Sequence, residues 1–133
     1  MAVTSTPIFV QTTKNKFANV TAATTDYTGA TTTNIVTLLT AGANGSKVFE
    51  IVVEVPVTSA AGHVQIWVDD AGAGTLRLFD TLAITAITVS TTVAPYRIAK
   101  QYDNFVLTAA SVVKAGVSVI NNPTVVHALY GDY

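Results

Sequence analysis

The stretch of the chain from Lys47 to Val57 alternates between large apolar side chains and a mixed set. Every second residue of a β-strand points to the same face of its sheet, so this pattern predicts a strand packed against a core on one side. The residues predicted on the apolar face are Phe49, Ile51, Val53, Val55 and Val57. The opposite face would carry Val48, Glu50, Val52 and Glu54. We therefore expect a sheet with one dry side and one mixed side.

A turn signal directly precedes this strand. Asn44-Gly45 is a favoured pair for a type I′ turn, in which both central residues need positive φ. We expect the turn to join two adjacent antiparallel strands. Val and Thr are β-branched and together make up roughly a third of the chain, which favours strands throughout.

Short segments with strand character follow one another along the chain, separated by turn residues. The predicted strands are residues 7–11, 17–22, 34–40, 47–57, 63–69, 75–82, 85–93, 95–99, 104–108, 117–121 and 124–130. Residues 24–33 are predicted to form a long loop or arm, residues 70–74 and 114–116 turns, and Asn122-Pro123 a break. We expect eight to ten short strands from these eleven candidate segments, and the pattern predicts an all-β, antiparallel two-sheet sandwich. A jelly roll is favoured over an immunoglobulin-type sandwich, which has about seven strands.

The length of 133 residues fits one domain, residues 1–133, with residues 1–13 as a candidate N-terminal contact arm. The absence of Cys excludes disulfides, thiolate metal ligands and Cys nucleophiles. No transmembrane segment is expected, because the uncharged stretch 81–96 is shorter than the ~20 apolar residues that a span requires. The N-terminus has no basic or apolar region typical of a secretion signal.

Charged residues form only 11% of the chain, against about 25% in an average protein. The formal net charge is -1 and the cations are scattered, so neither nucleic acid nor an anionic membrane is an expected partner. Interface cores are depleted in charge, so this composition suits permanent burial against other proteins. The alternative is a highly stable monomer with a Thr-rich surface.

No residue pattern in the sequence indicates a catalytic or metal-binding site, and we expect no enzyme activity, cofactor or metal. His63 and His127 are the only imidazoles, too few for a zinc site without Cys. Glu50 and Glu54 would lie ~13 Å apart on one strand, beyond the spacing of paired glycosidase carboxylates. Asp69-Asp70 precedes a Gly-rich turn, where turn chemistry is favoured over a Ca²⁺ site.

Aromatic residues provide the candidate contacts. If Val64, Ile66 and Val68 face the core, Trp67 points outward and could anchor a partner; the opposite register would bury it. Tyr130 and Tyr133 lie at the end of the chain, in a last strand or in a contact.

Four segments resemble a group of small virion proteins of tailed phages. They are "TPIFVQTTK" (residues 6–14), "TLLTAGANGSKV" (37–48), "KAGVSV" (114–119) and "GDY" (131–133). Members of this group resemble capsid cement or decoration proteins with a jelly-roll fold. The chain differs from them in its Thr-rich insertion at residues 24–33 and in residues 121–127.

The resemblance implies a structural virion protein on the outer surface of a phage head, bridging neighbouring copies of the major capsid protein. It also implies a homo-oligomer, a dimer or a trimer on a capsid symmetry axis. The expected contacts are the N-terminal arm, which could add to a sheet edge on a neighbour, and the C-terminal tyrosines. These residues are Pro7, Ile8, Phe9, Val10, Tyr130 and Tyr133. The alternatives are a receptor- or glycan-binding module with an aromatic platform near Trp67 and Asp69, and a small metal-dependent hydrolase or lyase.

Overall fold

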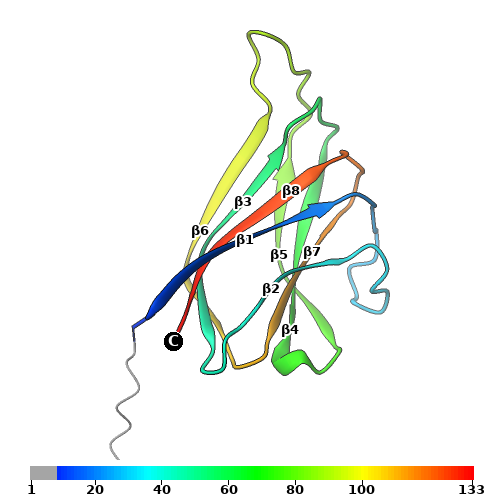
Figure 1. Cartoon of the computed structure of the whole chain (residues 1–133). Helices are drawn as coiled ribbons and strands as arrows, with labels where there is room; N and C mark the ends of the chain where they lie inside the picture. Colours follow the sequence, from blue (N-terminus) through cyan, green and yellow to red (C-terminus); the bar gives the residue numbers. More distant parts are fainter. Residues whose placement is uncertain (1–8) are drawn as a thin grey trace, which may run out of the picture.

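The computed structural model describes residues 9–133, which form two antiparallel four-stranded sheets packed face to face (Figure 1). Sheet A has the strand order β1-β8-β3-β6, and sheet B the order β2-β7-β4-β5. The strands of sheet A are β1 (Thr12–Val20), β8 (Thr124–Asp132), β3 (Ser46–Val55) and β6 (Tyr96–Leu107). Those of sheet B are β2 (Val36–Thr40), β7 (Val112–Val117), β4 (Gly62–Asp69) and β5 (Leu76–Ile84).

The strand pairing is nested. β1 pairs with β8, β2 with β7, β3 with β6 and β4 with β5, as in a long hairpin rolled into two layers. This is the strand order of an eight-stranded jelly roll, and it confirms the predicted all-β two-sheet sandwich. The described residues contain one short 3-10 turn, Asp70–Gly72, and no helix long and apolar enough to cross a membrane.

The core lies between the sheets and is mostly aliphatic. On β3, Ile51, Val53 and Val55 point into it with no exposed surface, as the alternation predicts. A β-bulge between Val48 and Glu50 shifts the phase of the strand, so that Val48 enters the core and Phe49 does not. Full burial of each such side chain contributes about 1.5–3 kcal/mol to the free energy of folding.

The turn before β3 differs from the prediction. Gly45 N donates to Gly42 O at 3.0 Å, and Gly45 has a φ of 90°, but Asn44 does not have positive φ. The turn is therefore not type I′, and it does not join adjacent strands. It carries the chain from β2 in sheet B to β3 in sheet A.

Several further segments depart from the predicted pattern. Residues 85–93 form a loop with one isolated bridge, between Ile87 and Ser59. The predicted strands 95–99 and 104–108 are parts of the single strand β6, and the predicted turn 114–116 lies inside β7. The polar residues 12–16, expected to follow a strand, are the first half of β1.

The open side of the sandwich between the edge strands β5 and β6 is closed by side chains. Lys100 Nζ and Tyr102 OH of β6 lie 2.5 and 2.7 Å from Asp80 Oδ2 of β5. Burial favours a higher pKa for Asp80, but these two hydrogen bonds outweigh it and hold the pKa below its ordinary value. Phe79 stacks on the core residue Phe105 with 3.9 Å between ring centroids. Phe79 therefore packs against the edge of the core with part of its ring and leaves the rest exposed.

Candidate functional site

Three loops meet at one end of the sandwich, at the top of Figure 1: residues 56–61, 85–95 and 118–123. They connect β3 to β4, β5 to β6 and β7 to β8. We call this surface the loop platform. None of its residues is Asp, Glu, Lys, Arg or His. The three loops of the platform therefore carry no charged side chain and no His.

Hydrogen bonds join the 56–61 loop to the 85–95 loop. Ser59 and Ile87 exchange two backbone hydrogen bonds of 2.9 and 3.1 Å. The Ser59 hydroxyl donates to Thr85 O at 2.7 Å and accepts from Ile87 N at 3.0 Å, and Val89 N donates to Thr58 Oγ1. Ser59 is 4% exposed, so these bonds are shielded from water. The longest loop of the platform is thus fixed at its base.

The third loop of the platform, residues 118–123, is fixed to the 56–61 loop. Asn121 is 4% exposed, and its side-chain amide bonds to both polar atoms of the Ala60 backbone. Asn121 O in turn accepts a hydrogen bond of 2.9 Å from Thr124 Oγ1 at the start of β8. The platform is pre-organised, which lowers the entropy cost of binding a partner.

Aliphatic side chains project from this platform. Val57, Val93, Val119 and Ile120 are 40, 44, 36 and 56% exposed. A hollow of about 300 Å³ lies at its base, lined by Pro56, Ala94, Pro95 and Tyr96 and by the ion pair Glu54–Arg97. Apolar projections beside a hollow, without charge to desolvate, suit contact with another protein surface.

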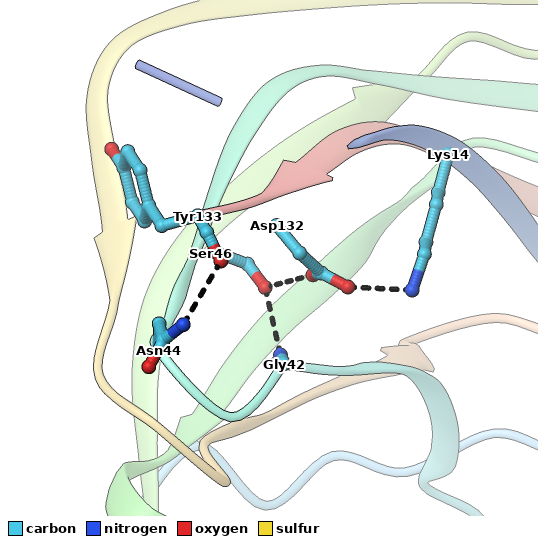
Figure 2. A network of polar contacts seen from close by, with 6 residues as sticks. All are labelled: Lys14, Gly42, Asn44, Ser46, Asp132 and Tyr133. Carbon is cyan, nitrogen blue, oxygen red and sulfur yellow. Dashed lines mark hydrogen bonds and ion pairs between the residues drawn. The ribbon is translucent and has the colours of Figure 1, made fainter. Parts of the chain in front are cut away.

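The opposite end of the sandwich holds the C-terminus in a polar network (Figure 2). The Asp132 carboxylate accepts hydrogen bonds from Lys14 Nζ, at 2.5 Å, and from Ser46 Oγ. Ser46 Oγ accepts from Gly42 N at 3.0 Å, so the network ties β1, β8 and β3 to the β2–β3 turn. Burial favours a higher pKa for Asp132, but the hydrogen bonds from Lys14 and Ser46 outweigh it and lower the pKa.

The residues expected from the sequence to make contacts fall in different places. Pro7 and Ile8 lie outside the described residues. Phe9 is 74% exposed, where the described chain begins, and Val10 is partly buried beside Gly131. Tyr133 is partly buried, and its carbonyl oxygen accepts a hydrogen bond from Asn44 Nδ2 (Figure 2).

Two of the expected contact residues are corrected by the structure. Tyr130 is 3% exposed because it points into the core from β8, so it is not a surface contact. Trp67 points away from the core between the sheets, which is the first of the two predicted registers. Residues 21–35 fold over it, however, and leave it 0% exposed. Its Nε1 donates to Gln65 Oε1, and Gln65 Nε2 donates to Thr24 O in that covering loop.

The burial of Trp67 removes the aromatic platform on which the glycan-binding alternative depended. The single N–H of Gly74 is shared between the two carboxylate oxygens of Asp69, at 3.0 and 3.1 Å, which confirms turn chemistry at that position. Among residues 9–133, no three His, Asp or Glu side chains are grouped closely enough to hold a metal ion.

The chain matches no family model, no curated protein and no solved structure. The loop platform was not predicted from the sequence. The one signal for it in the sequence is the uncharged stretch 81–96, whose β-branched residues predict strands rather than a loop. The other two loops are distant in sequence and reach the same end only through the jelly-roll connections.

Proposed function

We propose that this protein is a structural component of a phage virion, binding the outside of the head and bridging neighbouring major capsid protein subunits. The observation that carries the proposal is the loop platform, a fixed and uncharged end with four exposed aliphatic side chains. The sequence segments that resemble phage cement proteins supply the identity of the partner.

Stabilisation of the capsid follows from mass action. A protein that binds only the assembled lattice lowers the free energy of that lattice by its binding free energy. The platform itself loses little hydration on contact, because its Thr, Val, Ala and Pro side chains are uncharged. Simultaneous contacts to two capsid subunits make modest interfaces effectively permanent.

The test compares binding of purified variants to phage heads that lack the protein, measured by co-sedimentation. Val93→Asp and Ile120→Asp each bury a carboxylate in the proposed contact, and we expect each to weaken binding at least about tenfold. Ala109→Asp is the matched control, because Ala109 is exposed in the β6–β7 turn at the other end of the sandwich.

We expect Ala109→Asp to bind like the wild type, and all three variants to keep the wild-type melting temperature. If the platform variants bind as tightly as Ala109→Asp, the platform is not the contact. If the wild-type protein does not sediment with heads at all, the assignment to the capsid is wrong.

A further inference from the structure

The four edge strands of the sandwich are not equally protected against pairing with another chain. β1 and β6 are the edges of sheet A, and β2 and β5 those of sheet B. The pairings of β2, β5 and β6 with their neighbours each contain a register shift. Such irregularities bend an edge and hinder the addition of a further strand. β1 pairs with β8 in unbroken register from Thr12 to Val20.

The outward side of β1 carries no charge. Asn15, Phe17 and Asn19 point to the outer face of sheet A, in register with Leu129, His127 and Val125 of β8. Phe17 is 70% exposed, the highest value for a large apolar residue within any strand of the described chain. An exposed Phe in the middle of a regular edge strand is the feature that natural edges usually avoid.

The two lysines of β1 restrict how the strand could pair with a second copy of itself. A two-fold axis at residue 14, 15 or 16 would place lysine opposite lysine, which is destabilising. An axis at Phe17 places Lys16 opposite Ala18 and Lys14 opposite Val20 of the other copy. An axis at Phe17 also gives the longest paired segment of β1 in which no lysine faces another lysine. An axis at residue 18, by comparison, pairs only residues 16–20.

We propose that two copies of this chain pair through β1, antiparallel, about a two-fold axis at Phe17. The two Phe17 side chains then form a cross-strand aromatic pair, and Asn15 lies opposite Asn19 in both directions. The four strands of each sheet A join into one continuous eight-stranded sheet. The same strand pairs with itself, so the interface is closed and stops at a dimer.

This dimer deepens the proposed function and rests on it for its biological meaning. Because the two β1 strands run in opposite directions, the two loop platforms lie at opposite ends of the dimer. One dimer then presents two capsid-binding surfaces and can join two neighbouring subunits. A monomer would have a single platform.

The register is tested by introducing charges at two exposed positions. The molar mass of the isolated protein, measured by multi-angle light scattering, then distinguishes a monomer from a dimer. In the proposed register, the double variant Asn15→Lys with Asn19→Lys places a lysine of one copy opposite a lysine of the other on both sides of the axis. We expect this variant to raise the dimer dissociation constant at least about tenfold. Asn15→Glu with Asn19→Lys opposes unlike charges at the same places, and we expect it to dimerise at least as tightly as the wild type.

A second readout uses the absence of cysteine in the chain. Under mild oxidation we expect Phe17→Cys to form a covalent dimer, because the two sulfurs lie opposite each other at the axis. Thr13→Cys is the control, since Thr13 would lie about eight residues away from its own copy along the strand, ~26 Å, and should form no covalent dimer.

The proposal is overturned if the wild-type protein is a monomer at every concentration. It is also overturned if both double variants dimerise equally, or if Thr13→Cys cross-links as well as Phe17→Cys. These measurements need no capsid, so failure of the dimer is distinguishable from failure of head binding.

Discussion

Asn121 and Ala60 are joined by two hydrogen bonds that connect loops 61 residues apart in the sequence. Ala60 N donates to Asn121 Oδ1 at 2.7 Å, and Asn121 Nδ2 donates to Ala60 O at 3.1 Å. An amide side chain carries a donor and an acceptor side by side, so it can satisfy both the N–H and the C=O of one residue. The shape of the loop platform therefore depends on this one buried residue.

We predict that Asn121→Ala lowers the free energy of unfolding by about 1–3 kcal/mol, because it leaves both Ala60 groups without these partners. Thermal denaturation measures the effect, and each kcal/mol corresponds to a fall of about 4 °C in melting temperature. Asn104→Ala, an exposed position on β6, should leave the melting temperature unchanged. Equal melting temperatures for the two variants would show that the Asn121 bonds do not stabilise the platform.

The single tryptophan gives a test of the layer outside sheet B. Trp67 is 0% exposed, so its fluorescence should be blue-shifted and resistant to soluble quenchers. We predict no change in its emission when the protein binds phage heads, since Trp67 makes no contact with a partner. Trp67→Ala should cost about 3–5 kcal/mol of folding free energy. Ready quenching in the free protein would contradict the burial under residues 21–35.

The pKa of Asp132 predicts a dependence of stability on pH. Its folded pKa lies below the unfolded value of about 3.9, so its contribution is fully present above that value. It is lost as the pH falls through the folded pKa, when the carboxylate is protonated. We therefore predict that Asp132→Asn is less stable than the wild type at pH 7 by about 1 kcal/mol.

Urea unfolding at a series of pH values measures this difference. The gap between Asp132→Asn and the wild type should close as the pH falls through the folded pKa of Asp132. A gap that is constant across the acidic range would contradict the role given to the network with Lys14 and Ser46. Thr81→Ala, an exposed position on β5 outside this network, should show no gap at any pH.

A second carboxylate with a lowered pKa, that of Asp26, lies in the loop that covers Trp67. Asp26 accepts hydrogen bonds from the Thr28 hydroxyl, Thr28 N and Thr31 N, which lower its pKa to about 2. We predict that the charged carboxylate and these bonds persist below the ordinary pKa and are lost as the pH falls through about 2. The carbon chemical shift of the Asp26 carboxyl, followed by NMR, measures this titration. A midpoint near the ordinary value would contradict the fold of this loop.

The sheet architecture could be predicted from local patterns, because alternation and turn residues report which segments are strands. Ile51, Val53 and Val55 face the core as their spacing indicates. Residues 85–93 have the same β-branched character, yet they form a loop. They connect β5 in sheet B to β6 in sheet A, so the chain must cross the end of the sandwich there. Strand propensity cannot reveal that requirement.

Other predictions were wrong because residues that are typical of turns also occur inside strands and in turns of other types. Gly116 looked like part of a turn, but it lies in the central strand β7, where a Cβ would fall 3.0 Å from Gln65 Oε1. Asn44-Gly45 is a turn of another type between the sheets. The candidate site was harder to foresee, because its three loops are brought together only by the completed fold.

The most direct test of the central claim is the quantity of this protein in purified phage heads, measured by mass spectrometry against the major capsid protein. A lattice-bridging protein that binds through its loop platform should be present in many copies, in a fixed ratio to the major capsid protein. The Val93→Asp variant should be lost from heads, and the Ala109→Asp variant retained at the wild-type ratio. Absence of the wild-type protein from heads, or its presence at the tail or a single vertex only, would contradict the account.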